Sequence, residues 1–253
     1  MLEVNNLSFS YNKKRNILHD ISFNIKAKEV LCILGPNGCG KTTLLKSLCK
    51  IVDFDGEVLI DKENIKNKNR VYLAKKIAFM SQMSDIYFDY NVYDTIMLGR
   101  YSNFNDKLFS IPKEEDKKIV ENYINKLSLN HLKNKSIKEI SGGELQRVFI
   151  AMIFSQEPNI ILLDEPTNHL DINSQIELIN NLRKWVKNND NKAVIAVLHD
   201  INTALNFADK ILILKEGKQK YFGDIKNFNT DMLNEIYNIN LKEYMKSLLE
   251  IWN

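Results

Sequence analysis

The residues with the clearest chemical meaning run from Gly35 to Thr42, where GPNGCGKT has the spacing G-x-x-x-x-G-K-T. This spacing predicts a phosphate-binding loop, because glycines let backbone N–H groups turn toward phosphate oxygens and the lysine reaches the β- and γ-phosphates. A glycine-rich turn with an incidental lysine is the alternative. The apolar run Val30–Leu34 before the loop and the helical pattern Lys41–Lys50 after it favour phosphate binding. We therefore expect a nucleoside triphosphate as ligand.

Two adjacent carboxylates, Asp164 and Glu165, follow the apolar run Ile160–Leu163. A buried strand would carry both to the C-terminal edge of a parallel sheet, where open α/β sheets bind ligands. There Asp164 would hold Mg²⁺, directly or through water, and Glu165 would orient or deprotonate an attacking water. A pair of loop acids that cap a helix is the alternative. The phosphate-binding loop elsewhere in the chain favours the catalytic interpretation.

Two further polar residues end predicted strands. His199 follows Ala193–Leu198 and is expected at the same sheet edge as a sensor of the γ-phosphate. A histidine that only completes a hydrogen-bond network is the alternative. Gln82 follows the strand Lys76–Met80 and is a candidate contact of Mg²⁺ or the attacking water, on a signal that is weak by itself.

A second glycine-rich helix start lies at Ser141–Glu144, with the sequence SGGE. Ser141 and Glu144 form an S-x-x-E capping box, and the glycines between them expose backbone N–H groups. Because a plain cap does not need two glycines, we interpret this segment as a second anion site. Two such sites on one chain suggest that two chains enclose the nucleotide between them.

The elements expected to position these residues alternate strands with helices, which predicts a parallel sheet with helices on its faces. The strands and helices that give this pattern are expected at 30–34, 159–163, 172–185, 193–198, 201–207 and 210–214. Alternating strands at 2–9, 20–25 and 56–60 predict a small antiparallel sheet near the N-terminus. Residues from about 84 to 156 form a mostly helical insert, in which 114–127 has a period near 3.6.

The net charge, the apolar runs and the cysteines of the chain exclude some classes of function. A net charge of +3 argues against a dedicated nucleic-acid binder, and the longest apolar runs fall short of the ~20 residues of a membrane helix. We therefore expect any membrane role to come through a partner. The cysteines Cys32, Cys39 and Cys49 contain no CxxC pattern and suit a reducing cytoplasm. Cys39 lies near a helix N-terminus, where its thiol is expected to be somewhat acidic.

In combination, these motifs resemble the nucleotide-binding subunits of ATP-binding cassette (ABC) transporters, over nearly the whole chain from Met1 to about Leu241. The resemblance implies an α/β fold with a P-loop NTPase (RecA-like) core, a mostly parallel sheet, an N-terminal antiparallel β subdomain and a helical insert. Residues 1–253 would form a single ABC ATPase domain, with a helical subdomain at about 84–156 and a C-terminal helical tail at about 224–253.

The resemblance also implies roles for individual residues, with ATP and Mg²⁺ as ligands. Tyr11 would stack on adenine, although an aromatic that covers the core is the alternative. The implied ATP-binding residues are Tyr11, Gly35, Pro36, Asn37, Gly38, Cys39, Gly40, Lys41, Thr42 and Thr43. The implied catalytic residues are Glu165, His199 and Gln82, and the implied Mg²⁺ ligands are Thr42, Gln82 and Asp164.

A homodimer with ATP at its interface is implied as well. Contacts to ATP bound by the other subunit would come from Ser141, Gly142, Gly143 and Glu144. Asp171 would bridge the two subunits. This chain has Ile140 and Glu144 where the family usually has Leu and Gln. The implied partners are two integral-membrane permease subunits and, indirectly, an extracytoplasmic substrate-binding protein, with no nucleic acid; the implied location is the cytoplasmic face of the cell membrane.

Two segments indicate a subclass. Tyr93–Tyr101 and Asp164–Asp171 resemble segments of importers for ferric siderophores, haem and cobalamin, although the second is shared with ABC proteins that act on ribosomes. A ribosome-acting ATPase would have two cassettes and a linker, and a DNA-repair ATPase would have a long coiled coil. This chain has one cassette, and about a hundred residues without sustained heptads separate its two glycine-rich motifs. A transporter for another cargo, such as zinc or manganese or an exported compound, is the leading alternative.

Overall fold

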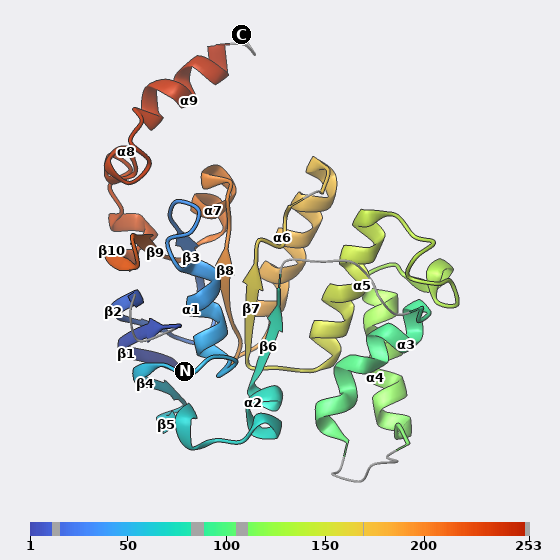
Figure 1. Cartoon of the computed structure of the whole chain (residues 1–253). Coiled ribbons are helices and arrows are strands. Elements are labelled where there is room, and N and C mark those ends of the chain that lie inside the picture. The colour runs from blue at the N-terminus through green and yellow to red at the C-terminus, as the bar shows by residue number, and fades with distance from the viewer. Residues whose placement is uncertain (12–15, 82–88, 105–110, 169, 251–253) are drawn as a thin grey trace. The chain divides into compact units, whose positions relative to one another are not determined.

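The computed structural model (Figure 1) describes residues 1–11, 16–81, 89–104, 111–168 and 170–250. The chain divides into two compact units. Unit 1 comprises Met1–Lys66 and Ala196–Asn253, and unit 2 comprises Asn67–Ile195. No helix among the described residues has both the length and the apolar character needed to cross a membrane.

Unit 1 is built on a mixed sheet whose strands lie in the order β5-β4-β1-β2-β10-β9-β3. β1 pairs antiparallel with β2 and β4, whereas β3 pairs parallel with β9. Its elements are β1 (Leu2–Ser10), β2 (Asn16–Ile25), β3 (Val30–Leu34), α1 (Lys41–Leu48), β4 (Asp55–Ile60), β5 (Glu63–Asn64), α7 (Ile201–Phe207), β9 (Lys210–Lys215), β10 (Lys218–Asp224), η4 (Ile225–Asn227), α8 (Met232–Tyr237) and α9 (Leu241–Glu250). A short 3₁₀ helix, η1 (Ile65–Asn67), spans the point in the sequence where unit 1 gives way to unit 2.

The strand pattern of unit 1 follows the burial of its side chains. All five residues of β3 are buried, as its unbroken apolar sequence requires of a central parallel strand. In β1, by contrast, Leu2 and Val4 are buried while Glu3 and Asn5 are exposed. This alternation is typical of a strand with one face on the core.

β10 was not expected from the sequence; it pairs antiparallel with β9 from Lys218 and Lys215 onward. The two residues between them, Glu216 and Gly217, have φ values of 53° and 73°. Two consecutive left-handed residues make the two-residue turn that joins antiparallel strands. Glu-Gly is a weaker signal for this turn than Asn-Gly or Asp-Gly, which explains the omission.

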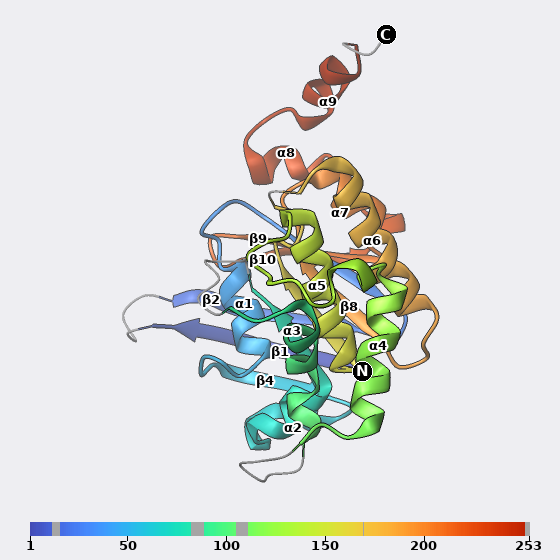
Figure 2. The same ribbon diagram turned by 90° about the vertical axis from the view of Figure 1, so that its right-hand side faces the viewer.

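Unit 2 combines parallel strands with a group of helices. β6 pairs parallel with β7, from Ile77 opposite Ile160 to Met80 opposite Leu163. The helices α3, α4 and α5 lie side by side in both views (Figures 1 and 2). The elements are α2 (Arg70–Lys76), β6 (Ile77–Met80), α3 (Val92–Met97), η2 (Leu98–Asn103), α4 (Glu114–Lys126), η3 (Asn130–Leu132), α5 (Gly142–Ser155), β7 (Ile160–Asp164), α6 (Ile172–Lys187) and β8 (Ala193–Val197), whose end extends into unit 1.

These elements confirm the predicted α/β class with antiparallel N-terminal strands and a group of helices. The bounds of β3 and α7 are those expected, while β2 begins at Asn16, earlier than predicted. The chain changes from α-helical to 3₁₀ geometry just before Gly99, because η2 begins at Leu98. The domain limits at about 84, 156 and 224 stay predictions.

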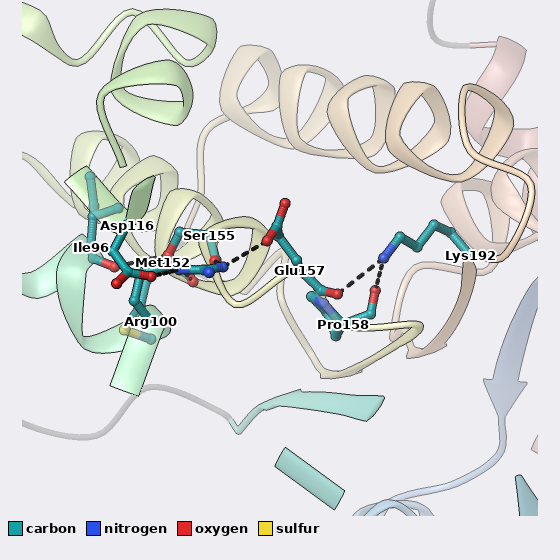
Figure 3. A network of polar contacts seen from close by, with 8 residues as sticks. All are labelled: Ile96, Arg100, Asp116, Met152, Ser155, Glu157, Pro158 and Lys192. Atoms are coloured by element: carbon teal, nitrogen blue, oxygen red, sulfur yellow. Dashed lines mark hydrogen bonds and ion pairs between the residues drawn. The ribbon is translucent and has the colours of Figure 1, made fainter. Parts of the chain in front are cut away.

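A buried arginine ties the helices of unit 2 together (Figure 3). Arg100 is 6% exposed, and its Nε donates to Asp116 Oδ1 at 2.9 Å. Its Nη1 donates to the Ser155 carbonyl at 2.6 Å and to the Glu157 carboxylate at 2.8 Å. One guanidinium therefore joins η2, the start of α4 and the end of α5, as its fixed set of donors allows.

The glycine before this arginine permits a close approach of backbone to backbone. A Cβ atom at Gly99 would lie 2.1 Å from the Met152 carbonyl oxygen and 2.3 Å from Ser155 Oγ. Any side chain at this position would push η2 away from α5. Gly99 and Arg100 thus each have a packing role in unit 2.

Removing the arginine side chain leaves Asp116 as a buried carboxylate without its main counter-charge. We predict that Arg100→Ala lowers the free energy of unfolding by about 3 kcal/mol, since breaking one partner of a buried ion pair costs about 3–5 kcal/mol. Urea unfolding followed by circular dichroism measures the change. Arg70→Ala is the matched control, because Arg70 is exposed at the start of α2. Equal midpoints for the two variants would contradict the role of Arg100.

Candidate functional site

The loop from Gly35 to Thr42 lies in unit 1 between β3 and α1. Gly35 has a φ of 148°, and a Cβ atom there would lie 2.1 Å from the carbonyl oxygen of Leu214 in β9. Gly40, the N-cap of α1, has a φ of 106°. A Cβ atom there would lie 2.7 Å from Cδ2 of Leu18 in β2. Only glycine fits either place, so β9 and β2 set the shape of the loop.

Lys41 extends over this loop rather than into solvent. Its side chain is 6% exposed, and Nζ donates to the Gly35 carbonyl at 2.7 Å and to the Pro36 carbonyl at 3.0 Å. The first turn of α1 directs its N–H groups and positive partial charge to the same side. Asn37 and Gly38 are exposed at the loop's tip. The loop therefore presents the donors that a phosphate group needs.

A cavity of about 520 Å³ adjoins the loop. Its walls come from the loop itself, the start of β2, the β9–β10 turn and the end of α8. The lining residues include Pro36, Cys39, Glu216 and Tyr237. The sequence analysis assigned no chemistry to the tail after Asp224, yet Tyr237 contacts the loop: its hydroxyl accepts a hydrogen bond from the Gly35 N–H at 3.1 Å.

The expected acidity of Cys39 is wrong. The side chain is only 5% exposed, and burial raises the pKa of the thiol above its ordinary value. The charge of Lys41 and hydrogen bonds from backbone N–H groups lower the pKa, but desolvation outweighs them. Cys39 therefore fills space in the loop as an un-ionised thiol.

Tyr11 and His199 are the other candidates in unit 1. The Tyr11 ring is 62% exposed and contacts only the edge of Phe9, with ring centroids 4.6 Å apart, among the contacts described for it. Such exposure disfavours the interpretation of Tyr11 as a cover for the core and suits stacking on a base. His199 follows β8, is exposed, and precedes Asp200, the N-cap of α7.

Asp164 and Glu165 lie in unit 2 at the C-terminal end of β7. Asp164 is 3% exposed. Glu165 is half-buried in the left-handed region, with φ at 55°, and its Oε2 accepts a hydrogen bond from Asn168 Nδ2 at 2.7 Å. Asn168, which the sequence analysis did not single out, thus fixes the carboxylate's direction. Gln82, expected after β6, lies outside the described residues.

The capping box at the start of α5 is confirmed. Ser141 Oγ accepts from the Glu144 N–H at 3.4 Å, and Glu144 Oε2 accepts from both the Ser141 N–H and its hydroxyl at 2.8 Å. These bonds, the backbone bond first, lower the pKa of Glu144. Nothing lies within 4 Å of a Cβ placed on Gly142, so that backbone is open.

Asp171 lies next to this helix start within unit 2. It is the N-cap of α6: its carboxylate accepts from the Ser174 N–H at 2.9 Å and the Ser174 hydroxyl at 2.8 Å, which lowers its pKa. A Cβ on Gly143 would lie 2.7 Å from Ser174 Oγ. Ser174, which the sequence analysis did not identify, therefore packs the Asp171 loop against the glycines of α5.

The Ser141 hydroxyl is predicted to contribute to the lowered pKa of Glu144, after the Ser141 backbone N–H. Because the pKa of Glu144 is lowered in the folded state, its bonds contribute stability above the unfolded pKa and lose it as pH falls through the folded pKa. We expect Ser141→Ala to raise the pKa of Glu144, so this loss begins at higher pH. Carbon-detected NMR titration of Glu144 measures the pKa, with Ser128→Ala as control. An unchanged pKa would contradict the assignment.

Comparison with known proteins agrees with this arrangement of motifs. The sequence profile of the family described as ABC transporter matches residues 18–168, more than half of the chain. The petrobactin import ATP-binding protein FpuC of Bacillus anthracis is 34% identical over 88% of this chain and 81% of its own. The ferric enterobactin transport ATP-binding protein FepC of Escherichia coli is 33% identical over 89% and 83%.

Solved structures agree in fold. A chain from a structure described as an inward-facing conformation of a metal-chelate type ABC transporter superposes with a TM-score of 0.80 at 29% identity, over 94% of this chain and 88% of that chain. A dimeric ATP-binding cassette in a post-hydrolysis state with ADP and Pi superposes with a TM-score of 0.76 at 28% identity, over 90% of this chain and 100% of that chain. This chain belongs to the ABC transporter family as an ATP-binding subunit that hydrolyses ATP for transport.

Proposed function

We propose that this chain powers the uptake of a metal chelate of the ferric siderophore, haem or cobalamin class. The observation that carries this proposal is its similarity, over most of each chain, to proteins named for petrobactin and ferric enterobactin transport. The segment Tyr93–Tyr101 adds less support, because Gly99 and Arg100 within it have packing roles. A transporter for zinc, manganese or an exported cargo would use the same cassette chemistry with a different membrane partner.

ATP binding is assigned to unit 1. In this proposal the N–H groups of the loop and the Lys41 ammonium hold the β- and γ-phosphates, and Tyr11 stacks on adenine. The preformed loop supports this role, because donors that are already in place cost little ordering when ATP binds. Lys41 Nζ already lies on the loop carbonyls, within reach of a phosphate that enters there.

Thr42, Gln82 and Asp164 are the proposed holders of Mg²⁺. The half-buried Thr42 hydroxyl and the nearly buried Asp164 carboxylate are hard oxygen donors of the kind that Mg²⁺ prefers. When bound, the ion would neutralise charge on the β- and γ-phosphates.

Hydrolysis is assigned to Glu165, with His199 as a γ-phosphate contact. The carboxylate of Glu165 would accept a hydrogen bond from the attacking water and orient it or take its proton. The hydrogen bond from Asn168 Nδ2 supports this role, because it holds one oxygen of the Glu165 carboxylate and so orients the whole carboxylate group. His199 would donate to the oxygen on which charge accumulates.

A head-to-tail homodimer is the proposed working unit. The N–H groups of Gly142 and Gly143 and the Ser141 hydroxyl would contact the γ-phosphate bound by the other subunit. Asp171 would bridge the subunits. Ser174, which binds Asp171 and lies beside Gly143, would couple the position of Asp171 to that of the glycines of its own chain. A related cassette that is dimeric with ADP and Pi supports this arrangement.

The proposed partners are two integral-membrane permease subunits and, indirectly, an extracytoplasmic substrate-binding protein. The chain would work at the cytoplasmic face of the membrane, held there by the permeases. ATP would close the dimer and hydrolysis would reopen it, with each closure moving the permeases. The similarity to a chain of a complete transporter of metal-chelate type supports this assembly.

Glu165→Gln separates hydrolysis from binding. We predict that ATP turnover falls at least about 100-fold, as expected for loss of a general base, while ATP is still bound. The unhydrolysed nucleotide should hold the dimer together, which light scattering detects as a doubled mass with ATP. Glu115→Gln on the exposed face of α4 is the control. Turnover near that of the control would remove Glu165 from the mechanism.

Membrane partners test the transport assignment. Tagged protein purified from detergent-solubilised native membranes should carry a polytopic membrane subunit. Uptake of a radiolabelled ferric siderophore, haem or cobalamin should then fail in cells that carry Lys41→Ala. Copurification with a metal-ion permease instead would keep the transporter and change the cargo, while ribosomal proteins would contradict transport.

A further inference from the structure

The tail of the chain reaches the phosphate loop through one hydroxyl group. Tyr237, the last residue of α8, accepts a hydrogen bond from the Gly35 N–H at 3.1 Å. The two residues are 202 positions apart in sequence. Tyr237 also lines the cavity of about 520 Å³ beside the loop, together with Pro36, Asn37 and Gly38.

Gly35 is held at both ends of its backbone by these contacts. Its N–H is bound by Tyr237, and its carbonyl accepts from Lys41 Nζ at 2.7 Å. On its α-carbon side the Leu214 carbonyl leaves no room for a side chain, at 2.1 Å from a would-be Cβ. The Lys41 ammonium therefore binds the carbonyl of a glycine whose N–H is bound by Tyr237 of the tail. The position of the ammonium depends on both contacts.

The helix that carries Tyr237 is itself firmly attached to unit 1. Leu233 is fully buried, and Ile236 is 5% exposed. Lys215 at the end of β9 donates from Nζ to the Glu235 carbonyl at 2.6 Å and to Asn238 Oδ1 at 3.4 Å. An anchored helix can hold a hydroxyl group in one place, whereas a loose tail cannot.

The chemistry of the phenol suits a lasting contact. A tyrosine hydroxyl offers acceptor lone pairs to an N–H as well as a proton of its own. Burial raises the pKa of Tyr237, so the hydroxyl stays protonated through the physiological range. The contact is thus neutral and does not add negative charge beside a site for polyphosphate.

We propose that Tyr237 is a positioning residue for nucleotide binding, which holds the Gly35 peptide so that the phosphate loop is preformed before ATP arrives. The inference rests on the proposed role of Gly35–Thr42 as the ATP-binding loop. A preformed loop strengthens the binding of ATP and of its transition state alike, because the ordering cost is already met. Its loss should therefore raise KM and leave kcat unchanged.

The test is Tyr237→Phe, which keeps the ring and removes the hydroxyl. Tyr244→Phe in α9 is the matched control, because the Tyr244 side chain is 55% exposed. We expect Tyr237→Phe to raise both the KM for ATP and the Kd for a fluorescent ATP analogue by about fivefold, which corresponds to one neutral hydrogen bond. We expect kcat and the melting temperature to stay at the values of the control.

Two results would overturn the proposal. An unchanged KM and Kd in Tyr237→Phe would show that the hydroxyl does not position the loop. A fall in kcat together with a lower melting temperature would show a purely structural contact. Lys41→Ala separates this failure from failure of the site itself: if that variant binds the ATP analogue like the natural chain, the loop assignment falls, and the role of Tyr237 with it.

Discussion

Donors that are fixed before a polyphosphate arrives bind it at little ordering cost, and much of this structure serves to fix such donors. Backbone N–H groups bind phosphate well when the segment that carries them is already held in the binding conformation. Here β9 closes one side of Gly35, β2 closes one side of Gly40, and the buried Lys41 spans the loop. The apolar strand β3 anchors the loop from behind, with all five residues buried.

The second glycine-rich helix start obeys the same constraint by different means. At α5 the N–H groups are fixed by a capping box rather than by neighbouring strands. Glu144 satisfies the Ser141 N–H and leaves the Gly142 backbone open. The replacement of the family's usual Gln by Glu therefore serves the helix start, at the cost of a negative charge close to the proposed γ-phosphate position. Ser174 then links this start to Asp171.

Sequence reasoning placed residues correctly where the pattern is local, while their chemical roles stay predictions. The loop Gly35–Thr42, the carboxylates at the end of β7 and the capping box are all local patterns, and the loop and the carboxylates lie at the ends of unbroken apolar runs. It failed where a contact joins distant residues: nothing near Tyr237 in the sequence points to Gly35. Cys39 shows a second limit, because proximity to a helix start predicted an acidic thiol while burial, invisible in sequence, decides the opposite.

Gly99 and Arg100 show a third limit of pattern reading. Their sequence pattern suggested a subclass of importer, and the structure gives both a packing function inside unit 2. A residue retained for packing says little about cargo, which this subunit has no site to recognise in the proposed mechanism. In the proposed mechanism, the membrane partner rather than the cassette would determine the cargo.

In the proposed function, each ATP site combines the phosphate loop of one chain with the glycine-rich start of α5 from another. Mixing two inactive variants, Lys41→Ala and Gly143→Asp, tests it directly by ATP turnover. If sites are shared, mixed dimers contain one intact site, and an equal mixture should recover about a quarter of the natural activity. If turnover stays at the background of the separate variants at every mixing ratio, each chain works alone and the claim is wrong.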